Sequence, residues 1–163
     1  MRELLPQAER VAALLKQRKQ TIAIAESSAG GLISAALLAV PGASAYCRGA
    51  AVAYTRHVWL AMRDVDPAEL GKIRSATEDW ASFQAHAIRD KFGADWGLGE
   101  TGAAGPTGNR YGDPAGHACF AVAGRGVARA KTLSTGSNDR VANMYAFAAE
   151  ALDMLVECLE AGA

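Results

Sequence analysis

Apolar residues recur along this chain with two different spacings. Where they lie three or four positions apart, as between Leu4 and Leu15, they form one stripe of an amphipathic helix. The helices predicted in this way cover residues 3–17, 28–39, about 75–93 and 138–159. Shorter apolar runs bounded by glycine, proline or polar residues are typical of strands. The strands predicted in this way cover residues 21–25, 46–55, 94–100, 117–123 and 127–133.

The order of these elements predicts the fold class. Helices and strands alternate early in the chain, and two strands that can pair across Gly124-Arg125-Gly126 come late. This order favours an α/β fold, a three-layer α/β/α sandwich with a mixed sheet and helices on both faces. Residues 57–63 are ambiguous, and residues 64–72 are predicted to form a turn-rich connection. Ser75-Ala76-Thr77-Glu78 matches a capping box at a helix start.

Length and charge limit the classes of protein that fit. With 163 residues, the chain is expected to form a single domain over residues 1–163. The 17 basic and 17 acidic residues are interspersed, which argues against nucleic acid as a partner. No apolar run has membrane-spanning length, and residues 1–6 lack a signal-peptide core, so a cytoplasmic location and no membrane partner are expected. The cysteines and histidines lack ligand spacing, so no metal site is predicted.

The segment from Ala25 to Gly31 joins a predicted strand to a predicted helix. It contains an acid, Glu26, two hydroxyls, Ser27 and Ser28, and the pair Gly30-Gly31. Backbone N–H groups at a helix start carry partial positive charge, so this turn can hold an anion or a developing oxyanion. The alternative is a small-residue turn with a serine cap, and the turn by itself favours that alternative.

A long loop at residues 101–116 is the second candidate site. Its five glycines allow backbone N–H groups to approach a phosphate, although a mobile surface loop has the same composition. The overlapping segment Gly97 to Gly102 fits the dinucleotide pattern G-x-G-x-x-G, but it lies within a predicted strand instead of opening a helix. No Walker A motif occurs, and no cofactor is predicted.

These pieces together resemble the C-terminal domain of the CinA family, which includes stand-alone nicotinamide mononucleotide deamidases. The resemblance rests on short motifs in family order, so a single CinA C-terminal-like domain is expected. The motifs are Ala25 to Gly31, Pro41 to Ser44, Ala53-Tyr54-Thr55, Gly102 to Pro106, and Pro114-Ala115-Gly116.

The resemblance implies an amidohydrolase that converts nicotinamide mononucleotide to nicotinic acid mononucleotide and ammonia. Carried over by motif, the nucleophile falls on Ser44 and an assisting tyrosine on Tyr54. The family lysine falls on Trp59, whose indole N–H cannot accept a proton. Strand alternation from Tyr54 predicts that His57 points away from the site. The implied substrate-binding residues are Ser27, Gly30, Gly31, Thr101, Gly102, Gly105 and Arg110, the last of which is expected to pair with a phosphate.

Three hypotheses remain open from the sequence. The first is an active amidohydrolase with Ser44 and Tyr54 at its centre. The second, motivated by Trp59 at the lysine position, is a non-catalytic domain that binds a mononucleotide. The third is a partner-binding scaffold, and the many small and apolar residues suit contacts in a homo-oligomer. The first two hypotheses both require residues 27, 44, 54 and 101 to converge around one hollow.

Overall fold

A five-stranded mixed sheet organises the protein. The computed structural model describes residues 1–62, 66–124 and 126–162. The sheet has the order β2-β1-β3-β4-β5, in which β1 runs parallel to β2 and β3 and the remaining neighbours are antiparallel. The strands are β1 (Ile22–Glu26), β2 (Cys47–Val52), β3 (Trp96–Ala103), β4 (His117–Gly124) and β5 (Val127–Ser134). The predicted late hairpin is therefore β4 and β5, and the register of β1 on β2 shifts next to Gly49.

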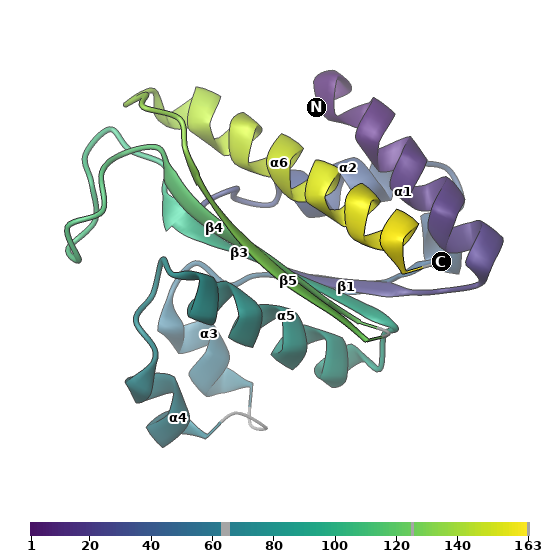
Figure 1. Cartoon of the computed structure of the whole chain (residues 1–163), viewed down its shortest axis with the longest axis horizontal. Helices are drawn as coiled ribbons and strands as arrows, with labels where there is room; N and C mark the ends of the chain where they lie inside the picture. Colours follow the sequence, from purple (N-terminus) through teal and green to yellow (C-terminus); the bar gives the residue numbers. More distant parts are fainter. Residues whose placement is uncertain (63–65, 125, 163) are drawn as a thin grey trace.

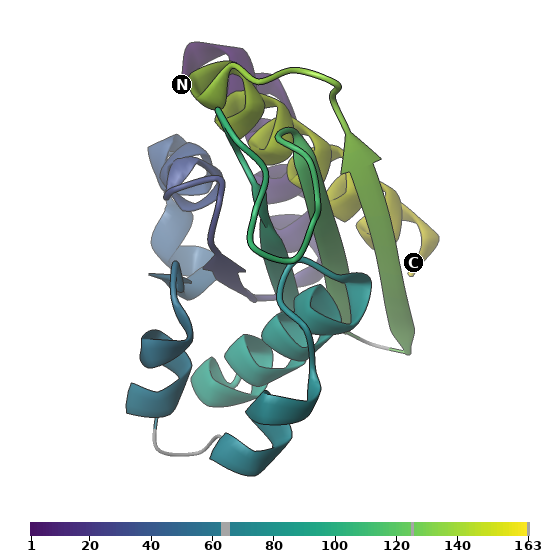
Figure 2. The ribbon, with the colours of Figure 1, turned by 90° about the vertical axis from the view of Figure 1, so that its left-hand side faces the viewer.

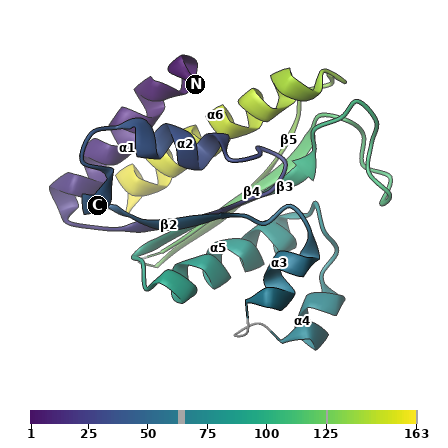
Figure 3. The ribbon, with the colours of Figure 1, turned by 180° about the vertical axis from the view of Figure 1, so that it is seen from behind.

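Helices cover both faces of this sheet, which confirms the predicted α/β/α sandwich (Figures 1 and 3). One layer contains α1 (Leu5–Arg18), α2 (Leu32–Ala39) and α6 (Arg140–Ala161). The opposite layer contains α3 (Arg56–Ala61), α4 (Pro67–Lys72) and α5 (Glu78–Phe92). Short 3₁₀ helices lie at Arg2–Leu4 and Ala43–Ala45. Within the described residues, no helix combines the length and the hydrophobicity that crossing a membrane requires.

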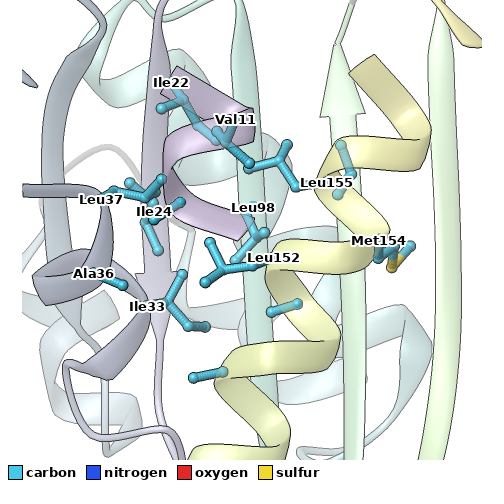
Figure 4. Packing of buried hydrophobic residues seen from close by; sticks show 14 of the residues in the cluster. Val11, Ile22, Ile24, Ile33, Ala36, Leu37, Leu98, Leu152, Met154 and Leu155 are labelled. Atoms are coloured by element: carbon cyan, nitrogen blue, oxygen red, sulfur yellow. The ribbon is translucent and has the colours of Figure 1, made fainter. Parts of the chain in front are cut away.

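Alternation along β1 divides the core between the two layers. Ile22 and Ile24 belong to the large apolar cluster beneath α1, α2 and α6, where Figure 4 shows Ile22 near Val11 and Ile24 near Leu37 and Leu98. The intervening residues Ala23 and Ala25 belong to the cluster on the α5 face. The large side chains thus fill one layer, while alanines let the other layer approach the sheet closely.

Glycines in β3 allow α5 to lie directly on the sheet. A Cβ atom on Gly97 would come within 1.9 Å of the Ala85 carbonyl oxygen, and one on Gly99 within 2.1 Å of the Ala81 carbonyl oxygen. Only a residue without a Cβ fits these contacts. The dinucleotide-like pattern that begins at Gly97 therefore reflects helix-to-strand packing.

Residues 57–72 contain more helix than the sequence indicates. Residues 57–61 of the ambiguous segment belong to α3, and α4 replaces part of the predicted turn-rich connection, with Pro67 in its first turn. Residues 63–65, which both predictions include in part, lie outside the described residues. The cap of α5 also differs from the predicted capping box, because the N-cap residue is Thr77 and not Ser75. Thr77 caps α5 by accepting a hydrogen bond from the Trp80 N–H at 3.2 Å, whereas the Ser75 hydroxyl accepts one from Arg56. Because Thr77 and Ser75 are both good cap residues, the local pattern alone did not select between them.

Candidate functional site

A cavity of about 710 Å³ opens beyond the carboxyl ends of the three neighbouring strands β2, β1 and β3. After β1 the chain continues toward α2 on one face of the sheet, and after β2 it continues toward α3 on the other face. Adjacent strands whose connections diverge in this way leave a crevice, which is the usual ligand position in α/β sheets. Figure 2 views this end of the molecule, with the loop that follows β3 in front of the sheet.

The turn after β1 is held by the carboxylate of Glu26, which is fully buried. This carboxylate accepts hydrogen bonds from the backbone N–H groups of Gly31 at 2.9 Å, Ile33 at 3.1 Å and Ser34 at 2.9 Å, and from the Ser34 hydroxyl. The start of α2 therefore has an anion from its own chain at its positive end.

Glu100, in β3, holds the other half of the same turn. Its carboxyl accepts hydrogen bonds from the N–H groups of Ser27 at 2.8 Å and Ala29 at 3.0 Å and from the Ser28 hydroxyl. Burial raises the pKa of Glu100 to about 7 despite these donors, and the neighbouring charge of Glu26 acts in the same direction. The sequence did not single out Glu100, because a lone acid in a Gly-rich strand carries no local signal of its partners.

Five predicted site residues line the large cavity and are brought together from four segments. They are Ser27, Tyr54, Thr101, Gly102 and Arg110. Three of the four residues that were expected to converge, at positions 27, 54 and 101, therefore do so in a single chain. Their chemical roles remain predictions.

Ser44 does not join them. It lies in the 3₁₀ helix before β2, whereas Tyr54 follows β2, so the six-residue strand separates the two residues. At about 3.3 Å per strand residue, that separation is roughly 20 Å or more. Ser44 is exposed and is absent from the lining of the described cavities. The expected convergence fails for this residue because β2 runs straight between the two motifs, and its role as nucleophile remains a prediction.

Of the four glycines predicted to bind substrate, two line a described cavity and two do not. The N–H group of Gly30 donates to the Ser27 carbonyl oxygen at 3.1 Å, and that of Gly31 donates to Glu26. Neither residue lines a described cavity, so no contact supports their predicted binding role. Gly105 lines a second, smaller cavity together with Gly102.

The structure revises the expectations for Trp59 and His57. The Trp59 side chain is fully buried and packs edge-on against Phe83, with ring centroids 5.3 Å apart. His57 lines the large cavity, so the prediction that it points away is wrong. Strand alternation does not extend to it, because β2 ends at Val52 and α3 begins at Arg56. The His57 Nδ1 atom lies 3.4 Å from the Thr55 hydroxyl, which also lines the cavity.

The charged side chains that line this cavity are cationic. Among the described lining residues, Arg56 and Arg110 carry positive charge and none carries a carboxylate. Arg56 is fixed by hydrogen bonds to the Leu70 carbonyl oxygen at 2.6 Å and to the Ile73 carbonyl oxygen, and it lies 4.5 Å above the Trp80 ring. These partners are neutral, and among the residues that the structure describes no carboxylate forms an ion pair with Arg56. The cavity is therefore suited to an anionic ligand.

Arg110 has a more open position at the cavity rim. Its guanidinium donates to the Tyr111 hydroxyl at 2.8 Å and lies 5.0 Å from the centre of that ring. Hydrogen bonding with Ser75, and then with Arg110, lowers the pKa of Tyr111. Arg74 lies over the same ring and forms an ion pair with Asp113 at 2.8 Å, which compensates that third arginine.

A second cavity of about 220 Å³ adjoins the first. Tyr54, Gly102 and Asn109 line both cavities, so the two share a wall. Arg140, at the start of α6, lines the smaller cavity. Sequence reasoning missed Arg140 because it is distant in the chain from every motif considered. Within the described part of the chain, no group of three or more His, Cys, Asp or Glu side chains is placed to hold a metal ion.

The family model of the CinA C-terminal domain matches residues 5–159. The chain belongs to the CinA family. A CinA-like protein of Gloeobacter violaceus is 39% identical over 126 residues, which cover 77% of this chain and 30% of that protein. A CinA-like protein of Desulforapulum autotrophicum is 35% identical over 154 residues, covering 94% of this chain and 36% of that protein. The chain thus spans about a third of the length of these curated CinA relatives.

Solved CinA structures share this fold over nearly the whole chain. A CinA superfamily protein from Klebsiella pneumoniae superposes with a TM-score of 0.89 at 26% identity, covering 97% of this chain and 98% of that one. The competence/damage inducible protein CihA from Agrobacterium tumefaciens gives a TM-score of 0.87 at 27% identity, covering 96% and 95%. The five-stranded sheet with two helical layers is therefore the CinA domain fold.

Proposed function

We propose that this CinA domain binds an anionic mononucleotide in the cavity at the carboxyl ends of β1, β2 and β3. The observation that carries the proposal is the cavity itself, which has two arginines and no carboxylate among its described lining residues. Such a charge distribution attracts a ligand that carries a negatively charged phosphate, because the guanidinium groups stay protonated.

The exposed tyrosine of the cavity supports a ligand that also contains a flat ring. Tyr54 lines the cavity and is 60% exposed, whereas arginines already lie over the rings of Trp80 and Tyr111. Aromatic faces stack on heterocyclic rings and favour cationic ones in particular. The pyridinium ring of nicotinamide mononucleotide fits both properties, and the family resemblance points to the same ligand.

Hydrolysis of the nicotinamide carboxamide is a second candidate function, favoured by the hydroxyls and the imidazole that share this cavity. A hydroxyl of Ser27, Thr55 or Thr101 would add to the carboxamide carbon while His57 accepts its proton. His57 would return this proton to the amide nitrogen as the C–N bond breaks, so that ammonia leaves. Water would then hydrolyse the ester, which releases nicotinic acid mononucleotide and restores the hydroxyl. Trp59 cannot supply the base, because it is buried and its N–H only donates.

Titration calorimetry with nicotinamide mononucleotide tests the binding proposal. We expect saturable heat for the wild type and a weaker affinity for Arg110→Ala, because the substitution removes one of the two arginine charges among the described residues that line the cavity. Arg48→Ala is the matched control, because Arg48 is an exposed arginine of β2 that does not line the cavity. Absence of both heat and a thermal shift with pyridine and purine mononucleotides would contradict the proposal and favour a scaffold role.

Ammonia release from the same ligand tests the second candidate. If His57 is the base, His57→Ala should reduce the rate by about 10²–10⁴-fold without a matching loss of affinity. Ser44→Ala tests whether the nucleophile is a hydroxyl of the cavity or Ser44. An unchanged rate indicates that the cavity of one chain suffices, whereas a comparable loss indicates that Ser44 supplies the nucleophile. No ammonia above a no-enzyme control would exclude the amidohydrolase and leave the binding function.

A further inference from the structure

The small cavity beside the larger one has the composition of an anion subsite. We infer that it receives the phosphate of the mononucleotide, while the larger cavity receives the ribose and the ring, and that Arg140 determines the preference for a phosphorylated ligand. The inference rests on the proposed mononucleotide function. Its starting point is the shared wall of Tyr54, Gly102 and Asn109, which allows one ligand to extend through both spaces.

Arg140 is held in position and keeps unused donors. Its Nη1 donates to the Gly105 carbonyl oxygen at 2.6 Å, and its Nη2 donates to the Tyr54 hydroxyl at 3.2 Å. A guanidinium has five N–H donors, so about three remain for a ligand. Among the described residues, no carboxylate forms an ion pair with Arg140. A fixed, uncompensated guanidinium is suited to bidentate binding of phosphate.

The loop opposite Arg140 adds further donors. Thr107 and Gly108 line the small cavity, and within the described residues neither takes part in a hydrogen bond. Their backbone N–H groups and the Thr107 hydroxyl are therefore available. A Cβ on Gly108 would come within 2.3 Å of the Asp113 carbonyl oxygen, so a residue without a side chain is needed where this loop folds back. N–H groups exposed in a tight loop form anion-binding concavities.

Size and position favour Arg140 over Arg110 as the phosphate partner. The small cavity, at about 220 Å³, suits a phosphate group, whereas the space of about 710 Å³ also accommodates a sugar and a ring. Arg110 lines only the larger space and stacks on Tyr111 at its rim. Tyr54 lies at the junction and is hydrogen-bonded to Arg140, so a bound phosphate would also fix the tyrosine next to the sugar.

A comparison of ligands with and without phosphate tests the assignment. Affinities for nicotinamide mononucleotide and nicotinamide riboside are measured with wild type, Arg140→Gln and Arg110→Gln, and inorganic phosphate serves as a competitor. We expect Arg140→Gln to weaken mononucleotide binding at least tenfold, to leave riboside binding within twofold, and to abolish competition by phosphate. Arg140→Lys should recover part of the affinity because it restores charge without the bidentate geometry.

The possible outcomes separate this inference from the function on which it rests. If Arg140→Gln retains the preference for the phosphorylated ligand and Arg110→Gln loses it, the phosphate site is at the rim and the inference is overturned, while the binding function stands. Equal losses for mononucleotide and riboside with Arg140→Gln would show a purely structural role for Arg140 and would also overturn it. A wild-type protein that binds neither ligand refutes both proposals. Thermal unfolding of each variant verifies that the fold is intact.

Discussion

Neutralising Glu100 should stabilise the protein at high pH and not at low pH. Glu100 is fully buried, and its pKa is raised from 4.5 to about 7, first by desolvation. Between these two pH values the folded chain keeps a proton that the unfolded chain has released. Stability from this group is therefore fully present below pH 4.5 and is lost as pH rises toward 7. Each pKa unit corresponds to about 1.4 kcal/mol, so the difference between 4.5 and about 7 lowers the free energy of unfolding by about 3 kcal/mol at high pH.

Glu100→Gln is the appropriate perturbation because an amide preserves the size of the side chain and its hydrogen bonds. Its carbonyl oxygen can accept from the N–H groups of Ser27 and Ala29, and its NH₂ group can donate to the Ser28 hydroxyl oxygen, which then acts as acceptor. We therefore expect the variant to match the wild type at pH 4.5. At pH 8 we expect it to be more stable by about 3 kcal/mol.

Urea unfolding at a series of pH values between 4.5 and 8 measures this difference. For a urea slope of about 2 kcal/mol/M, the midpoint of the variant should exceed that of the wild type by about 1.5 M at pH 8. Glu9→Gln, on the exposed surface of α1, is the control for a change of charge without burial. A wild type that gains stability over Glu100→Gln as pH rises would refute the reasoning. It would show that the three hydrogen bonds stabilise the carboxylate more than desolvation opposes it.

The remaining predictions concern packing and capping. Gly99→Ala places a Cβ about 2.1 Å from the Ala81 carbonyl oxygen and should lower the free energy of unfolding by about 1–3 kcal/mol or more. Gly71→Ala, in open space on α4, should be neutral or stabilising, and equal effects would contradict the packing argument. Trp59→Lys should destabilise by about 3–5 kcal/mol without a gain in ammonia release, so a more active and stable variant would show that this position faces the site. Asp139→Ala removes the cap of α6 and should cost about 1 kcal/mol in thermal unfolding; an unchanged midpoint would contradict that role.

The periodicity of apolar residues predicted most of the fold, because the spacing that distinguishes a helix from a strand is present within a short stretch of sequence. The alternation of Ile22, Ala23 and Ile24 is enough to define a strand with two different faces, and the structure places those faces in different apolar clusters. The helices α3 and α4 were not predicted from the sequence, because each has only six residues. So short a segment presents too little of a repeating apolar stripe, and its helical state depends on contacts such as those of Arg56 with the α4 region.

The sequence by itself determined the layered α/β class, the elements of the sheet and the family to which the motifs belong, because these depend on residue order and spacing. Tertiary structure decided which motif residues meet. It brought positions 27, 54 and 101 to one cavity, left Ser44 at the far end of β2, and turned His57 toward the cavity. It also placed Glu100 under the turn and Arg140 beside Tyr54, through contacts that span 72 and 86 residues. These contacts depend on the order of the strands in the sheet and on the path of the chain between them. The residues next to Glu100 and Arg140 in the sequence therefore do not indicate them.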